Sequence, residues 1–230
     1  MPLILSIETS TSTSSIALHD AGRLISSQHI HVDKSHAEYL ALSIKYLFET
    51  SGYAIRDCQA VAISKGPGSY TGLRIGTSTA KGICYAIGAK LISINTLKAM
   101  ALGVSQYQFE EVLLCPMIDA RRMEVYCMVT KADLDEIEPT TAKIIDDHAF
   151  DHLLTQHKML FFGNGSAKCV SKLSQYSNAV FIPNVLPSAV HVGDLAWRAF
   201  QDGIFEDIAY FEPFYLKDFI AKKPSVNRLV

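Results

Sequence analysis

The chain lacks the features that mark several large classes of protein. None of its apolar runs approaches the length that spans a membrane, and its start, residues 1–5, has no basic segment that would open a signal peptide. Its five cysteines are odd in number, and no two of them stand in a CxxC spacing. Such cysteines argue against a disulfide framework and against a zinc site. We therefore expect a cytoplasmic protein that makes no contact with a membrane.

The chain also lacks a surplus of positive charge. Its formal net charge is only -2, which disfavours a free-standing nucleic-acid-binding protein. Apolar residues make up 49% of the 230 residues and charged residues 19%, so the chain has enough apolar material for a core and little reason to be disordered. If RNA is involved, we expect another subunit to supply most of the phosphate contacts.

Several catalytic motifs are missing as well. No GK[ST] follows the glycine-rich segment at 66–72, and that segment does not match GxGxxG. There is no HExxH, and Ser69 stands in Gly-Pro-Gly-Ser-Tyr rather than in the GxSxG turn of a hydrolase. The sequence therefore offers no nucleophile with an oriented base, and we predict no catalytic residue.

The pattern of apolar residues predicts two similar α/β lobes. Strands are expected at 3–8, 15–19, 24–32, 60–64 and 91–94, with helices at 35–48, 72–88 and 96–104. The order then restarts with strands at 112–118, 123–130, 141–145, 159–162 and 179–182 and helices at 147–157, 166–174 and 188–203. We predict an N-terminal lobe at 1–105, a C-terminal lobe at 106–216, and a polar, basic tail at 217–230 of a composition typical of disordered ends.

The first predicted helix has two unlike faces. Ser35 and Glu38 fit a capping box at its start, and Leu40, Ile44 and Leu47 repeat at helical spacing. The face that carries His36, Tyr39, Ser43 and Tyr46 presents two aromatic rings instead of plain charge. A helix with such a second face often packs on another protein surface.

The glycine-rich segment 66–76 has two readings. Its backbone N–H groups could cradle a phosphate at the start of a helix, or its glycines could simply allow a tight turn and close packing. The helix that follows carries a stripe of small residues: Gly72, Gly76, Thr79 and Ala80. Such a stripe lowers helix propensity but lets two backbones approach closely, so tight packing is the favoured interpretation.

Charged residues follow the first strand of each lobe. Glu8 ends the first strand of one lobe and Asp119 that of the other, while Arg121 and Arg122 follow Asp119. Neither acid is followed by the glycine that a phosphate loop normally needs, and paired arginines more often satisfy carboxylates than bind a separate anion.

The histidines give no firm metal site. His148 and His152 are four apart on a predicted helix, a spacing that can chelate a metal, but Asp146, Asp147 and Asp151 beside them look like an ordinary solvated face. His29 and His31 are two apart, which places them on one face of a strand.

Several segments resemble one protein family. The segment 66–82, GPGSYTGLRIGTSTAKG, is similar to the signature of the TsaB (YeaZ) branch of the glycoprotease-like (M22) TsaD/TsaB superfamily. Supporting matches are Ile7-Glu8-Thr9-Ser10-Thr11, the stretch 119–126, and Pro213-Phe214-Tyr215-Leu216. They occur in the right order along nearly the whole chain. The resemblance implies a two-lobed fold like that of the actin/Hsp70 ATPases, a duplicated ribonuclease H-like α/β fold.

The resemblance also implies a function and partners. It implies pairing with the catalytic subunit TsaD and the ATPase TsaE, in an assembly that forms N6-threonylcarbamoyladenosine at position 37 of ANN-decoding tRNAs. The chain would meet tRNA only indirectly, through that complex, and would form a homodimer on the same surface when alone. The implied pairing surface lies on the first two helices and comprises His36, Tyr39, Leu40, Ser43, Tyr46, Tyr70, Gly72, Leu73, Gly76, Thr79 and Ala80.

The same resemblance suggests a vestigial nucleotide cleft between the lobes. It would be lined by Glu8, Thr9, Ser10, Asp119, Arg121, Gly163 and Gly165. No cofactor is required on this reading, and residual binding of ATP or ADP is left open. Glu8 stands where the family usually has Asp.

The departures from the catalytic relatives favour a scaffold subunit. Where those relatives carry two histidine metal ligands, this chain has Thr96 and Met100, so we expect no metal and no enzymatic activity of its own. Two alternatives stay open: an independent ATPase, which rests on fold analogy alone, and a peptidase. On the scaffold reading, Gly76→Leu is expected to block association while the monomer stays folded.

Overall fold

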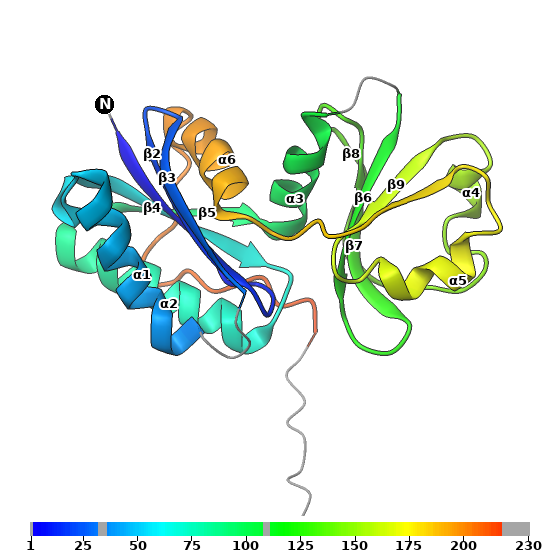
Figure 1. The fold of residues 1–230 in the computed structure, drawn as a ribbon, viewed down its shortest axis with the longest axis horizontal. Coiled ribbons are helices and arrows are strands. Elements are labelled where there is room, and N and C mark those ends of the chain that lie inside the picture. The colour runs from blue at the N-terminus through cyan, green and yellow to red at the C-terminus, as the bar shows by residue number, and fades with distance from the viewer. Residues whose placement is uncertain (1, 32–35, 108–110, 218–230) are drawn as a thin grey trace, which may run out of the picture.

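The computed structural model describes residues 2–31, 36–107 and 111–217, without the side chains of residues 36 and 37. Two five-stranded sheets run through it, in the orders β3-β2-β1-β4-β5 and β10-β9-β6-β7-β8 (Figure 1). Numbered from the start of each half, the two orders are the same. The sequence prediction of a duplicated α/β architecture is therefore confirmed.

The first sheet combines a meander with two parallel strands. β1 (Leu3–Glu8), β2 (Ser14–Asp20) and β3 (Arg23–Ile30) pair antiparallel, while β4 (Cys58–Gly66) and β5 (Lys90–Asn95) continue parallel to β1. β1 is central, and all six of its residues are buried, which explains its unbroken apolar run. β3 is the edge strand and is largely exposed.

The second sheet repeats this plan. β6 (Leu113–Asp119), β7 (Glu124–Thr130) and β8 (Glu136–Ile144) form the meander, and β9 (Met159–Phe162) and β10 (Ala179–Ile182) run parallel to β6. β8 begins several residues before the predicted strand at 141–145. Its ladder with β7 extends to the pair Thr130 and Glu136 across two register shifts, which the sequence pattern did not reveal.

The outer faces of the two sheets are covered differently. α1 (His36–Ser51) and α2 (Tyr70–Ile87) are long helices that cover the first sheet, next to the short 3-10 helix η1 (Ile55–Asp57). Ser69 caps α2 at its start, and Gly88 ends it in a left-handed conformation with φ 72°. Within the described residues, the outer face of the second sheet is covered by α4 (Asp151–Leu154), the 3-10 helix η2 (Ala167–Cys169) and α5 (Val170–Leu173).

Two further helices lie between the sheets. α6 (Ala189–Gln201) packs on β1 and β2 of the first sheet, although it follows the strands of the second. α3 (Thr96–Ser105) follows β5 but packs on β6 and β7 of the second sheet (Figure 1). Each half thus contributes its last helix to the inner face of the other, and one apolar cluster fills the space between the sheets.

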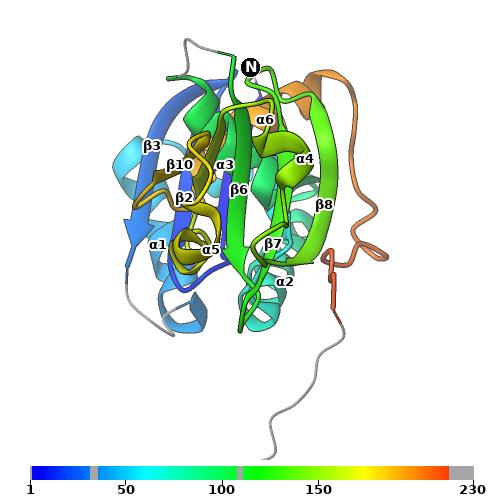
Figure 2. The same ribbon diagram turned by 90° about the vertical axis from the view of Figure 1, so that its right-hand side faces the viewer.

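The segment after α6 also returns to the first half. Figure 2 shows it running along the side of the molecule from α6 toward the chain end. Its backbone N–H groups donate from Glu206 to the carbonyl of Leu91 (2.8 Å) and from Phe214 to that of Lys65 (2.7 Å). Residues 189–217 therefore pack on the first half, whereas the sequence places residues up to 216 in the C-terminal lobe. The division at residue 105 as a boundary between domains stays a prediction.

The helices predicted at 147–157 and 166–174 are much shorter in the structure. Side chains compete with the helix at the first of them, because the carboxylate of Asp146 accepts the backbone N–H of His148 at 2.9 Å. The predicted cap at Ser35 and the tail from residue 218 onward lie outside the described residues. None of the described helices is both long enough and apolar enough to cross a membrane.

Candidate functional site

The exposed side of α1 and α2 carries apolar side chains that no part of the described chain covers. On α1, Tyr39 is 40% exposed, Leu42 48% and Tyr46 57%, and on α2 Tyr85 is 87% exposed. Small exposed residues run between them along α2 at four-residue spacing: Ser78, Gly82 and Ala86. We call these seven residues the outer helical face.

The predicted pairing residues divide between this surface and the interior. Tyr39 and Tyr46 are exposed, and Tyr70 and Thr79 are half-buried. The side chain of His36 lies outside the described residues. The other six predicted residues are buried within the subunit: Leu40, Ser43, Gly72, Leu73, Gly76 and Ala80.

The buried glycines of α2 serve the packing of the helix on the sheet. A Cβ at Gly76 would overlap the hydroxyl of Thr9 and lie 2.9 Å from Cδ1 of Ile63. The hydroxyl of Thr9 donates to the carbonyl of Gly72 at 2.9 Å, so helix and strand touch directly. Of the two interpretations of the glycine-rich segment, these contacts support tight packing. These contacts oppose the expectation that Gly76→Leu leaves the monomer folded, because the new side chain has no room.

The first acid-bearing loop is closed by the glycine-rich turn. Glu8 is 1% exposed, and its carboxylate accepts the backbone N–H of Ser10 at 2.5 Å and the hydroxyl of Ser64. The backbone N–H of Ser69 donates to the carbonyl of Ser10 at 2.6 Å, and a Cβ at Gly68 would overlap the same carbonyl. Thr9 and Ser10 are fully buried. A phosphate at this loop would have to displace residues 66–69.

The second acid-bearing loop is open to solvent. Asp119 accepts hydrogen bonds from the ammonium of Lys168 and from the backbone N–H of Arg121 (2.9 Å). Partial burial alone would raise the pKa of Asp119, but these hydrogen bonds and the nearby positive charges outweigh it and lower that pKa. Asn164, in the turn after β9, accepts the backbone N–H of Asp119 at 3.0 Å.

The predicted cleft residues therefore form two separate groups. Gly163 and Gly165 flank Asn164, and a Cβ at Gly165 would lie 2.8 Å from the carbonyl carbon of Ile118, so both glycines belong with Asp119 and Arg121. Glu8 ends β1, and Thr9 and Ser10 follow it in the loop that is buried against α2. The loop at Asp119 is the one whose charged side chains face solvent.

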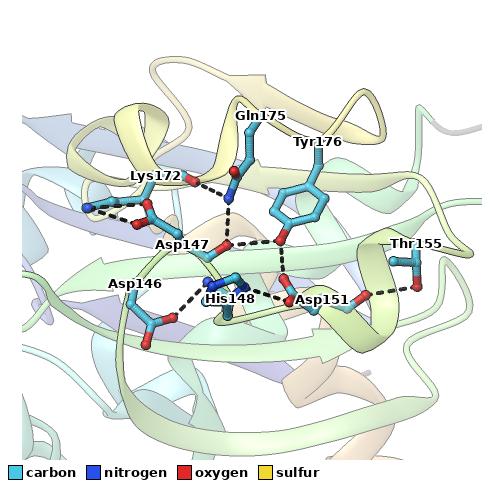
Figure 3. A network of polar contacts seen from close by, with 8 residues as sticks. All are labelled: Asp146, Asp147, His148, Asp151, Thr155, Lys172, Gln175 and Tyr176. Carbon is cyan, nitrogen blue, oxygen red and sulfur yellow. Dashed lines mark hydrogen bonds and ion pairs between the residues drawn. The ribbon is translucent and has the colours of Figure 1, made fainter.

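The predicted histidine pair makes ion pairs. His148 Nδ1 lies 2.8 Å from Asp151 Oδ2, and His152 Nε2 lies 2.8 Å from Glu138 Oε1. Figure 3 shows Tyr176 donating to Asp151 and to the carbonyl of Asp147. The bond to Asp151 raises the pKa of Tyr176 to about 12. Within the described part of the chain, no group of three or more His, Cys, Asp or Glu side chains is arranged to hold a metal ion.

Sequence reasoning missed most of the outer helical face. Leu42, Ser78, Gly82, Tyr85 and Ala86 were not predicted, although Ser78, Gly82 and Ala86 repeat at the spacing of one helical face. That repeat was a usable signal. It lies on the side of α2 opposite to the buried stripe, and nothing in the sequence ranks one stripe of small residues above the other.

Comparisons with known proteins agree with the resemblance. The family model for TsaD, tRNA N6-adenosine threonylcarbamoyltransferase, matches residues 25–230. The TsaB protein of Escherichia coli K12, named as a tRNA threonylcarbamoyladenosine biosynthesis protein, is 28% identical over 96% of both chains.

Solved structures agree on the fold. YeaZ from Pseudomonas aeruginosa superposes with a TM-score of 0.81 at 24% identity, over 94% of this chain and 100% of that one. An ADPNP-bound activator of 2-hydroxyisocaproyl-CoA dehydratase from Clostridium difficile reaches 0.51 at 10% identity, over 87% and 95%. These likenesses concern the fold alone, and they confirm the predicted two-lobed fold of the actin/Hsp70 type. The chain belongs to the TsaD/TsaB superfamily, in its TsaB (YeaZ) branch.

Proposed function

We propose that this chain acts in tRNA threonylcarbamoyladenosine biosynthesis as a partner-binding subunit without catalytic activity of its own. It pairs with a TsaD-like transferase through the outer helical face, and a TsaE-like ATPase joins the pair. The observation that carries this proposal is the outer helical face itself, where Tyr39, Leu42, Tyr46 and Tyr85 are exposed together with a row of small residues.

The composition of the outer helical face suits a protein partner. Tyrosine is enriched at protein interfaces, and contiguous apolar patches on a soluble protein often mark such contacts. Gly82 has nothing within 4 Å of the place where a Cβ would stand, so a partner's helix can approach the backbone of α2 closely there. A stable complex buries roughly 800 Å² on each partner, and the two helices that would carry the interface are 16 and 18 residues long.

The core between the sheets supports the absence of catalysis. Thr96 and Met100 stand where the resemblance places the histidine ligands of catalytic relatives, and they are 0% and 2% exposed. Met100 belongs to the apolar cluster between the sheets. A methionine packed in an apolar core binds no hard or borderline metal ion, so the chain depends on a partner for the chemistry.

Association with a purified TsaD-like protein from the same organism tests the proposal. At micromolar concentrations we expect the two to co-elute from a size-exclusion column. Leu42→Glu places a charge on the outer helical face and should weaken association at least tenfold, as measured by titration calorimetry. The matched control is Ile144→Glu, at the end of β8. It replaces another exposed aliphatic side chain by the same charge and should leave affinity unchanged.

Failure to co-elute would contradict the pairing. Unchanged affinity in the Leu42 variant would mean that the pairing uses a surface other than the outer helical face. Because we propose that the homodimer uses the same face, adding the partner should convert dimers of this chain into heterodimers. Light scattering follows that exchange directly. Calorimetry with ATP and magnesium on the isolated chain tests one of the two alternatives, since tight binding would favour an independent ATPase.

A further inference from the structure

The turn between β6 and β7 holds two consecutive arginines in an unusual backbone conformation. Arg121 has φ 72° and Arg122 has φ 48°, in the left-handed region that glycine and asparagine normally occupy. The loop is closed by the Ala120 N–H donating to the Glu124 carbonyl and the Glu124 N–H donating to the Arg121 carbonyl, both at 3.1 Å. Strain held at such positions often serves a function, because glycine would make the same turn at lower cost.

Neither arginine forms an ion pair within the described chain, although the charge of Arg121 helps to lower the pKa of Asp119. Both side chains are exposed, and no described carboxylate lies within ion-pair distance of either guanidinium. The two acids of the hairpin have other partners, since Asp119 pairs with Lys168 and Glu124 with Lys217. The lysines therefore neutralise the acids, and the arginines remain as outward positive charges.

Lys217 brings the C-terminal segment to this hairpin, and aromatic rings adjoin it there. The ring of Tyr215 lies 4.9 Å from that of Tyr70, at an angle of 40°. The guanidinium of Arg74 lies 5.4 Å above the ring of Tyr70, and its Nη1 donates to the hydroxyl of Tyr70 at 3.1 Å. Tyr215 keeps 37% of its surface exposed. Cations and aromatic rings thus form one strip from the start of α2 to the β6–β7 turn, crossing both halves.

We propose that this strip, the basic–aromatic surface of Tyr70, Arg74, Arg121, Arg122 and Tyr215, contacts RNA directly, with Lys217 and its partner Glu124 joining the C-terminal segment to the β6–β7 turn. Arginine forks match phosphate oxygens, and exposed aromatic rings offer faces on which unpaired bases stack. The surface is local, since the whole chain has a net charge of -2. It supplies direct phosphate contacts where the sequence predicted only indirect ones. The inference rests on the proposed function, because it is in the assembled complex that tRNA meets this surface.

A double glycine substitution separates charge from folding at the turn. Arg121→Gly with Arg122→Gly removes both cations and relieves the left-handed strain, so the melting temperature should rise by about 2–4 °C. The probe is an unmodified tRNA transcript, titrated into the full chain assembled with its TsaD-like partner. We expect affinity to fall about tenfold at 0.1 M salt, and the slope of log affinity against log salt to shrink by roughly 1.4–1.8.

The matched control removes two cations elsewhere. Arg23 and Lys131 are exposed and lie outside the basic–aromatic surface, at the β2–β3 and β7–β8 turns. Arg23→Gln with Lys131→Gln should leave both affinity and salt slope unchanged. A second comparison is Tyr215→Phe, which keeps the stacking face and should retain affinity, against Tyr215→Ala, which should lose about fivefold or more.

The outcomes distinguish this inference from the proposed function. If the double glycine variant binds its partner and tRNA as the wild type does, with the same salt slope, the inference is overturned. It is equally overturned if the variant loses the protein partner, because the strip is then a protein contact. If the wild-type chain fails to pair with a TsaD-like protein but binds the transcript through Arg121 and Arg122, the proposed function fails while the RNA surface stands.

Discussion

The two acid-bearing loops occupy equivalent places in the duplicated halves but differ in environment. After β1, Glu8 is sealed beneath the glycine-rich turn and satisfied by Ser10 and Ser64. After β6, Asp119 faces solvent and pairs with Lys168, next to two arginines in left-handed conformation. The same topology thus gives a buried, hydrogen-bonded loop in one half and an exposed, charged loop in the other. Position in a fold does not by itself assign a role to a residue.

The helices that cover the outer faces of the two sheets also differ between the halves. In the first half, two long helices cover the outer face of the sheet, and apolar side chains on them are exposed. The second half covers its sheet with two four-residue helices, held together by the polar network of Figure 3. On the proposed function, the protein partner binds the first half, whereas the short helices of the second half cover its own core.

The largest expected effect is at the inner face of α2. Gly76→Leu forces a side chain into Thr9 and Ile63 and should destabilise the chain by about 4 kcal/mol or more, or unfold it. On the opposite face, Gly82→Ala meets no atom within 4 Å and should stabilise by about 0.5–1 kcal/mol through helix propensity. Urea denaturation followed by circular dichroism measures both. A folded, stable Gly76 variant would mean that α2 does not pack against Thr9 and Ile63 as described.

The second expected effect compares the two acids directly. Glu8→Ala leaves the buried N–H of Ser10 and the hydroxyl of Ser64 without their acceptor, and should destabilise by about 2–4 kcal/mol. Asp119→Ala removes a partly exposed ion pair with Lys168 and should cost less than about 1 kcal/mol. The same denaturation experiment decides. Equal losses of unfolding free energy at the two positions would contradict the difference between the buried loop and the exposed loop.

The strands followed from the sequence because each central strand needs an unbroken apolar run. β1 and β9, for example, lie at their predicted bounds. The packing of α3 and α6 on the sheet of the other half could not be predicted from the sequence. Both are apolar helices, and their sequences do not indicate which sheet they cover. The return of residues 189–217 to the first half likewise depends on contacts such as that between Phe214 and Lys65.

The site was only partly predictable, for a reason visible in α2. That helix carries two stripes of small residues, one with Gly72 and Gly76 and one with Ser78 and Gly82. A small residue gives little hydrophobic signal, so the pattern alone does not orient the helix. The hydroxyl of Thr9, which donates to the carbonyl of Gly72, and the side chain of Ile63 decide the orientation, and both lie outside the helix, just after β1 and on β4. The basic–aromatic surface was missed because its residues meet from three separate segments.

A third prediction concerns the exchanged helix α6. His19 on β2 is fully buried, and its Nε2 lies 3.5 Å from Asp194 Oδ1 on α6. Asp194→Ala removes this polar contact from a buried ring and should destabilise by about 1–3 kcal/mol. Asp202→Ala, just past the end of the same helix, is the matched control and should change little. If the two variants have the same stability, the contact between His19 and Asp194 contributes nothing to holding α6 on the first sheet.

The smallest expected effect is in the polar network of the second half, and it depends on pH. The hydrogen bond that His148 donates to Asp151 raises the pKa of His148 above 6.5, and the hydrogen bonds that Tyr176 and His148 donate to Asp151 lower the pKa of Asp151 below 3.8. The contribution of His148 is therefore complete below pH 6.5 and fades as pH rises through its raised pKa. That of Asp151 is complete above pH 3.8 and fades as pH falls through its lowered pKa.

These two limits leave a window between roughly pH 4 and 6.5 in which the pair contributes most. His148→Ala should lower the melting temperature there by at most about 2 °C, because both groups are exposed, and by nothing measurable at pH 9. His157→Ala, an exposed histidine three residues beyond α4, should show no such window. A His148 variant whose deficit stays constant from pH 5 to 9 would mean that packing, and not charge, holds α4 against α5.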